Sequence, residues 1–193
     1  VTHNSKIINK YFDNNKVVLG IHPNFYHKNK NVDQVLKHYF KFVKKPKYSR
    51  NHGFYESSEI AIKLKEKGVI FDSNLCLFLQ KNITPLYHWT GLIKLPVFWE
   101  DDIHMKKKLS WNFKLFEKYF KAPGLKIINI HPFLFSSNIS SINEYNKYKK
   151  FTKSFSNKNK NKIILNNRLF DLQLFIIEMI KFIKKHEYET VDF

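Results

Sequence analysis

The chain is short of cysteine and of long apolar runs. Its single thiol, Cys76, cannot form an internal disulfide framework or a zinc site built from several cysteines, and it is compatible with the cytoplasmic location that we expect. A bilayer-spanning helix needs about 20 predominantly apolar residues. The longest apolar run is shorter and has one polar face, so we expect a helix packed on the core and no membrane span. This run covers 169–183 and includes Asp171, Gln173, Glu178 and Lys181.

Arginine is also scarce, although the formal net charge is +18. Such a charge favours phosphate-rich partners, because lysine and arginine neutralise nucleic-acid backbones. Specific recognition of bases and phosphates usually uses the arginine fork, and only Arg50 and Arg168 are arginines among the 34 basic residues. Lysine is abundant together with asparagine, isoleucine and phenylalanine, which indicates a bias of the whole sequence. We therefore expect solvated surface lysines and no specific nucleic-acid partner.

A chain of 193 residues with 43% hydrophobic residues fits one domain with a sizeable core. Apolar strand-like runs alternate with segments of helical period, a pattern typical of a parallel α/β sheet or barrel. A Lys, Asn and Ser-rich segment near the end predicts a mobile surface loop at 147–161. We expect strands at 16–22, 48–52, 69–74, 92–99, 125–131 and 189–193, and helices at 32–43, 58–67, 110–121 and 169–185. The strand at 125–131 is almost entirely apolar, so we expect it to be buried on both faces.

Four polar residues follow the ends of expected strands: His22, His52, Asp101 and His131. In folds built from βα repeats, the carboxyl ends of the strands converge on one rim, where catalytic residues lie. Two imidazoles and a carboxylate can hold Zn²⁺ with an open fourth position, which lowers the pKa of bound water and polarises an amide carbonyl. A further histidine can protonate the leaving amine, with a carboxylate to orient it. This combination suits metal-dependent amide hydrolysis.

Five segments of the chain carry a family resemblance: Gly20 to Phe25, Arg50 to His52, Phe71 to Leu75, Leu95 to Asp102, and Asn129 to Pro132. In order and spacing, they are similar to segments of the polysaccharide deacetylase superfamily of the NodB type. The closest likeness is to its WbmS-like branch, which is associated with bacterial surface-polysaccharide gene clusters. The likeness covers about 1–131.

The resemblance implies an irregular (β/α)7-type barrel and a hydrolase that removes N-acetyl groups from a sugar of a surface polysaccharide or its precursor. It implies a divalent metal, Zn²⁺ in our expectation. His22 corresponds to the first histidine of the metal motif. Arg50 corresponds to the arginine that braces the catalytic carboxylate, and His131 to the general acid. Asp101 or Asp102 matches the acidic residue near that pair, and we expect Asp101 in the catalytic role.

Two departures from the family pattern affect the metal site and the base. Tyr26 stands where the second metal histidine would fall, and we expect His52 to take its place, with His3 and His27 as further candidates. The aspartate pair of the family's first strand would lie upstream of Val1. We therefore expect an amino-terminally truncated barrel domain over 1–193, which as given could lack activity.

Four further residues are candidates for substrate binding: Asn24, Asp72, Trp99 and Asp102. Each also has a structural interpretation. Asn24 and Asp72 suit turns, Asp102 suits a helix cap, and large aromatic residues such as Trp99 usually lie in the core. The histidines themselves could be hydrogen-bonded structural residues.

Two other functions compete with the hydrolase. A carbohydrate-binding barrel that has lost its metal ligands would bind sugar in the presence of a chelator without hydrolysing it. A basic nucleic-acid binder would require clustered lysines and an affinity that falls steeply with salt. The partner we expect is a carbohydrate, and no feature of the sequence indicates an oligomeric state.

Overall fold

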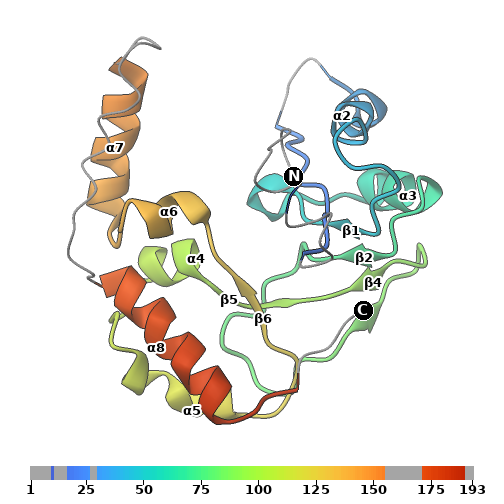
Figure 1. Ribbon diagram of the computed structural model, residues 1–193. Coiled ribbons are helices and arrows are strands. Elements are labelled where there is room, and N and C mark those ends of the chain that lie inside the picture. The colour runs from blue at the N-terminus through green and yellow to red at the C-terminus, as the bar shows by residue number, and fades with distance from the viewer. Residues whose placement is uncertain (1–9, 11–16, 27–29, 155–170, 190–193) are drawn as a thin grey trace. The chain divides into compact units, whose positions relative to one another are not determined.

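Figure 1 shows the chain as a computed structural model that describes residues 10, 17–26, 30–154 and 171–189. The chain divides into two compact units, which we call unit 1 (Val1–Phe98 with Gly124–Ile127) and unit 2 (Trp99–Pro123 with Ile128–Phe193). In chain order, the helices and strands that follow are α2 (Val32–Tyr39), β1 (Tyr48–Ser49), η1 (His52–Phe54), α3 (Ser58–Glu66), β2 (Phe71–Asp72), β3 (Leu86–Tyr87), β4 (Ile93–Lys94), β5 (Val97–Glu100), α4 (Asp101–Lys106), η2 (Phe113–Leu115), α5 (Glu117–Lys121), β6 (Ile127–Asn129), α6 (Pro132–Ser136), α7 (Ile142–Ser154) and α8 (Asp171–Lys185).

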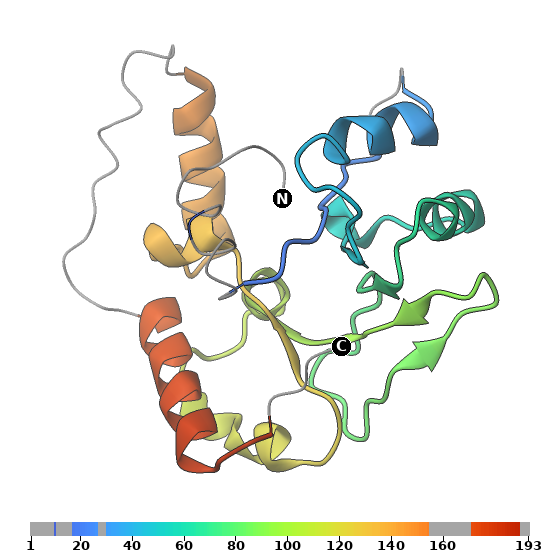
Figure 2. The same ribbon diagram turned by 45° about the vertical axis from the view of Figure 1, so that its right-hand side comes forward.

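Unit 1 contains a four-stranded sheet in the order β1-β2-β4-β3. β1, β2 and β4 are parallel, and β3 pairs antiparallel with β4 in a hairpin that is visible in Figure 2. Beyond β1, Ile21 forms a parallel bridge with Ser49, so the segment around His22 adds one more short strand to this edge. The parallel α/β arrangement places the residues that follow β1 and β2 at the same edge of the sheet.

Two helices with good capping residues cover this sheet on one side (Figure 1). α2 begins with a capping box, in which the Asn31 side chain accepts from the Gln34 amide and the Gln34 side chain bonds the Asn31 amide. α3 begins after Ser57, whose hydroxyl accepts from the Ile60 amide, and it ends before Gly68 at φ +87°. Their apolar faces meet in a core cluster of Ile21, Val35, Leu36, Tyr39, Val43, Ile60, Ala61, Leu64, Val69 and Leu92.

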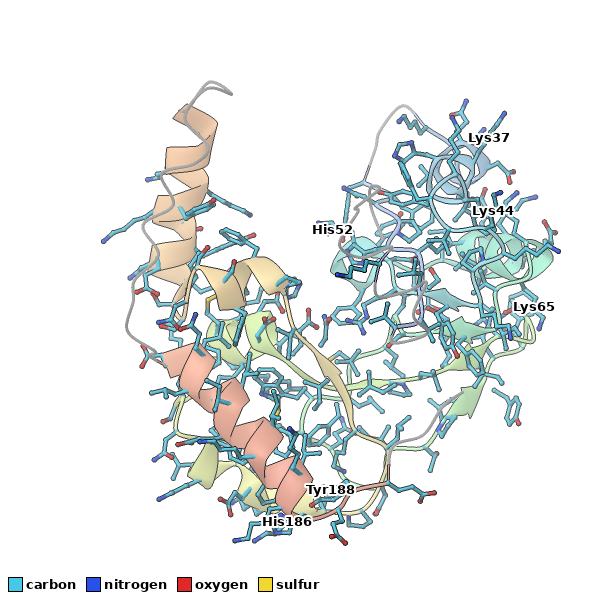
Figure 3. The ribbon with its side chains drawn as sticks, viewed as in Figure 1. Lys37, Lys44, His52, Lys65, His186 and Tyr188 are labelled. Carbon is cyan, nitrogen blue, oxygen red and sulfur yellow. The ribbon has the colours of Figure 1, made fainter. Side chains whose placement is uncertain are left out.

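The core of unit 2 is aromatic and is organised by α8, which packs beside η2 and α5 (Figure 1). Buried residues recur on one face of α8 at helical spacing: Leu172, Phe175, Ile176, Met179 and Phe182. The Phe175 ring lies 5.2 Å from Trp99 in a stacked arrangement and 5.3 Å from Phe113. Just after α8, Tyr188, which is labelled in Figure 3, donates a hydrogen bond to the Phe120 carbonyl. The polar face expected for this helix is confirmed.

Several expectations need correction. The mixed α/β class is confirmed, but the strands of the described residues form a four-stranded and a two-stranded sheet, and no closed barrel is seen among them. β6 is only half-buried, so burial on both faces was wrong. The expected loop begins inside α7, because 147–154 are helical, and 155–161 lie outside the described residues. The strand expected at 189–193 also lies outside them, apart from its first residue.

The strand expected over 92–99 is split into β4 and β5 by Leu95 and Pro96. Proline lacks the amide hydrogen that would continue a ladder, which explains the break. Of the helices in the described part of the chain, none is both long and apolar enough to cross a bilayer.

A buried histidine in unit 2 predicts a dependence of stability on pH. His104 is fully buried, accepts a hydrogen bond from the Trp99 indole at Nδ1 (3.1 Å) and donates one from Nε2 to the Ser110 carbonyl (2.9 Å). These bonds hold the neutral ring with its proton on Nε2, and burial lowers the pKa of His104 from 6.5 to about 4. The unfolded chain therefore binds the proton more readily. This contribution to stability is complete above pH 6.5 and is lost as the pH falls toward 4.

We expect the wild type to lose about 3 kcal/mol more unfolding free energy than His104→Gln between pH 7 and pH 4, since one pKa unit corresponds to about 1.4 kcal/mol. Glutamine offers one donor and one acceptor without titrating. Urea unfolding at several pH values measures the difference. Parallel curves for the two proteins would show that His104 is not held neutral.

Candidate functional site

A histidine and an aspartate that lie 30 residues apart form a tight pair in unit 2. Asp101 begins α4 directly after β5 and is completely buried. Its Oδ1 lies 2.5 Å from Nδ1 of the His131 ring, and its Oδ2 accepts from the His131 backbone amide at 2.7 Å. Pro132 begins α6, which leaves His131 in an extended conformation before the helix. Asp101 therefore holds both the backbone and the ring of His131.

The electrostatics of this pair favour a protonated imidazole. The hydrogen bond from the ring to Asp101 raises the pKa of His131, against the opposing effect of burial. Nε2 is left facing Glu100, whose Oε1 lies 3.7 Å away, and 42% of the side chain of His131 is exposed. A histidine with Nδ1 bound to a buried carboxylate and Nε2 accessible can donate a proton to a substrate atom and take one back.

Three side chains, with His131 among them, also form a candidate cation site. Glu100, Asp102 and His131 each offer a ligand atom, and these atoms lie within 4.8 Å of one another. One oxygen of Asp102 is paired with Lys106, and its buried Oδ1 has no hydrogen-bond partner among the described residues. Carboxylate and imidazole are ligands that Zn²⁺ accepts. The raised pKa of His131 opposes this role, because a protonated imidazole binds no metal.

Unit 1 brings together the two histidines that the sequence predicts as metal ligands. The ring centroids of His22 and His52 lie 5.8 Å apart, at an interplanar angle of 87°. Backbone hydrogen bonds join their segments: the Arg50 amide donates to the Ile21 carbonyl (3.1 Å), and the His52 amide donates to the Pro23 carbonyl (2.7 Å). The pair is therefore set by the parallel bridge between Ile21 and Ser49.

The protonation state of the His22 ring suits a metal ligand. Burial, followed by the electrostatic effect of the neighbouring His52, lowers the pKa of His22 to about 4, so its ring is neutral at pH 7. The ring also has a hydrogen bond to the Arg50 backbone. Metal-binding histidines usually donate one ring N–H to such a carbonyl and coordinate with the other nitrogen. Among the described residues no carboxylate, histidine or cysteine completes a group of three with this pair. His3 and His27 lie outside them.

The remaining candidates are placed as follows. Arg50 directly follows β1, and its backbone amide donates to the Ile21 carbonyl. Asn24 accepts a hydrogen bond from the Tyr26 amide, which is the turn chemistry weighed for it. Asp72 is buried and bonded to Lys94 and Asn74. Trp99 is fully buried in the core of unit 2, so the sugar contact expected for it has no exposed surface to use.

The sequence interpretation missed three polar residues. Glu100 was not among the candidate residues, yet its buried carboxylate lies beside His131. Lys94 is buried among carboxylates, and nothing in a lysine-rich sequence distinguishes it. His104 was not singled out. The usual alternation of buried and exposed side chains in a strand could not have identified the residues of 97–100 that face the site, because all four are buried.

The chain was compared with protein families, curated proteins and solved structures. The family model described as WbmS-like polysaccharide deacetylase matches residues 1–149. No curated protein matches the chain. A solved structure with 19% sequence identity, a candidate polysaccharide deacetylase involved in O-antigen biosynthesis (WbmS) from Bordetella bronchiseptica, covers 94% of this chain and 76% of its own with a TM-score of 0.81. The structural likeness shows the fold, and the family match shows the membership that the motifs predicted: the chain belongs to the WbmS-like polysaccharide deacetylase family.

Proposed function

We propose that this protein hydrolyses the N-acetyl amide of a sugar in a bacterial surface polysaccharide or its precursor. The observation that carries the proposal is the pair of Asp101 and His131, with its 2.5 Å contact between Oδ1 and Nδ1. Membership of a polysaccharide deacetylase family supports the substrate class and the reaction. The products are acetate and a free amine on the sugar.

His131 is the proton donor in this proposal. Amide hydrolysis breaks the C–N bond, and the departing nitrogen needs a proton because an amide anion is a very poor leaving group. The raised pKa favours the protonated ring of His131, and Nε2 is the nitrogen that can deliver the proton. The Asp101 carboxylate stabilises the charged ring before transfer and holds it in one orientation afterwards.

The residues of unit 1 supply two imidazoles for a divalent metal, Zn²⁺ in our proposal. His22 is neutral, is hydrogen-bonded to backbone on one side and faces His52, so the donor set fits two ligands of such an ion. When bound, the ion would polarise the amide carbonyl and acidify water. Arg50, whose backbone is bonded into the same ladder, is the residue that we propose to brace a catalytic carboxylate.

Acetate release and metal content test this proposal together. The purified chain is incubated with a panel of oligosaccharides that carry N-acetylhexosamine, before and after dialysis against a chelator, and then with Zn²⁺ returned. We expect acetate release to fall to background with the chelator and to recover with the metal, while His22→Ala loses near-stoichiometric zinc.

Asp102→Asn is the matched variant for the second cation site. Loss of zinc in Asp102→Asn, but not in His22→Ala, would move the metal to Glu100, Asp102 and His131. If sugars bind in chelator and no acetate is released under any condition, the carbohydrate-binding alternative replaces the hydrolase.

A further inference from the structure

We propose that Asp72, Asn74 and Lys94 form a buried clamp that positions the loop of residues 50–56, and through it the His52 imidazole beside His22. We call these three residues the clamp and residues 50–56 the His52 loop. The binding of a divalent cation by His22 and His52 rests on the proposed function, whereas the positioning of the His52 loop by the clamp does not. The clamp residues act through His52 and touch no substrate in this proposal.

The clamp holds the first part of the His52 loop through a side-chain to backbone hydrogen bond. Asn74 Oδ1 accepts from the Asn51 amide at 2.6 Å, and Asn74 Nδ2 donates to the Asp72 carboxylate. Asn51, Asp72 and Asn74 are all buried. A buried amide that lost this acceptor would carry the full cost of desolvation, so the bond is expensive to break. The backbone directly before His52 is therefore tied to β2.

The carboxyl end of the His52 loop is held by the ion pairs of Lys94. Lys94 Nζ lies 2.5 Å from Asp72 Oδ2 and also bonds the Glu56 carboxylate, which ends the loop. The side chain of Lys94 is 8% exposed and that of Asp72 is 1% exposed. Removing one member of a buried ion pair leaves an uncompensated charge, which strongly favours the paired arrangement. Lys94 thus connects β4 with the end of the loop.

Contacts within the loop transmit these two attachments to His52. The Asn51 side chain donates to the Tyr55 carbonyl at 2.8 Å, and the His52 amide donates to Pro23 at 2.7 Å. Gly53, at φ +62°, takes a conformation that favours glycine, and a Cβ there would meet the Tyr26 hydroxyl at 3.0 Å. The His52 backbone is consequently fixed on both sides, next to the segment that carries His22.

Such support changes metal affinity, because outer partners of metal ligands typically contribute 10- to 100-fold. The probe is Co²⁺ alone, titrated into the full chain and followed by its visible absorption spectrum. We expect Asn74→Ala to weaken the His22-dependent Co²⁺ binding by about tenfold or more and to alter the spectrum. Lys94→Met is a less suitable variant, because it leaves the buried Asp72 carboxylate without its ion-pair partner and so destabilises unit 1 as a whole.

Two variants control for stability and for chemistry. Asn31→Ala removes the cap of α2 in the same unit by the same substitution, and it should lower the melting temperature without changing the Co²⁺ affinity or spectrum. The exchange Asp72→Asn with Asn74→Asp keeps an acceptor for the Asn51 amide and an amide–carboxylate bond, and we expect it to restore part of the affinity. If Asn74→Ala, like Asn31→Ala, leaves the Co²⁺ affinity and spectrum unchanged, the clamp does not position His52 for cation binding.

Amide hydrogen exchange separates failure of the clamp from failure of the metal pair. We expect faster exchange at Asn51 and His52 in Asn74→Ala than in Asn31→Ala, with or without Co²⁺. If the wild type and His22→Ala bind Co²⁺ equally, the metal pair is refuted, and exchange alone decides the clamp. Unchanged exchange at both amides would show that the clamp does not hold the loop.

Discussion

His131→Gln is expected to lower the rate of acetate release by about 10²- to 10⁴-fold, the usual contribution of a positioned acid–base group. Glutamine preserves much of the shape and a hydrogen bond to Asp101 but delivers no proton to the departing nitrogen. The loss should appear in kcat at saturating substrate, because the proton is needed in the transition state rather than for binding. Acetate release from the best substrate of the oligosaccharide panel measures it.

Asp101→Asn should give a loss in the same range and should also change the pH profile. The Asp101 carboxylate raises the pKa of His131, and activity that requires the protonated ring falls as the pH rises through that pKa. Replacing the carboxylate with an amide removes the largest cause of the shift. The alkaline decline of the residual activity should therefore begin at a lower pH in the variant than in the wild type.

His88→Gln is the control for this pair. His88 bonds Thr90 in the hairpin of unit 1, away from Asp101 and His131 in the sequence. Loss of less than about tenfold in His88→Gln, beside a large loss in His131→Gln, would locate the proton donor. A His131→Gln protein that retains wild-type kcat would eliminate the proposed mechanism.

Phe175→Ala is expected to destabilise unit 2 by about 3–5 kcal/mol, the range measured for truncation of a buried phenylalanine. The ring is completely buried and lies within 4.9–5.7 Å of the rings of His104, Phe113, Phe116, Trp99 and Trp111. No neighbour can fill the space without leaving its own contacts. Whole domains are stable by only about 5–15 kcal/mol, so the loss would be a large fraction of the total.

Leu174→Ala is the matched control for this prediction. Leu174 precedes Phe175 on α8 but is 42% exposed, and we expect a change of less than about 1 kcal/mol. Urea unfolding is followed by tryptophan fluorescence, to which Trp99 and Trp111 contribute together with the exposed Trp89 of unit 1. Trp99 and Trp111 both contact the Phe175 ring. Equal midpoints for the two variants would mean that Phe175 does not organise this core.

The helices were largely predictable because their signals are local. The period of apolar residues in 32–43 and 169–185 predicted α2 and α8, and the helix expected at 58–67 is present as α3, between the capping residue Ser57 and Gly68. The strands were less predictable. Each contributes only two to four residues to a ladder, and their ends depend on partners distant in sequence. The helix expected at 110–121 is split into η2 and α5, and α4 and α6 were not predicted. The second half of α7 was predicted as a loop because its composition is polar.

The candidate site, too, was predictable where its signals are local and not where they depend on contacts between distant segments. The sequence alone determined which residue types follow the strands, and so it identified His22, His52, Asp101 and His131 as candidates and predicted the family. The resemblance allowed either Asp101 or Asp102 beside the general acid, and Asp101 was expected in the catalytic role. Only the tertiary structure shows which of them contacts His131, because β5 and α4 direct Asp101 to His131, while Asp102 pairs with Lys106 one turn along the helix. The burial of Lys94 and Trp99 was decided in the same way, since burial depends on segments that meet only in the folded chain.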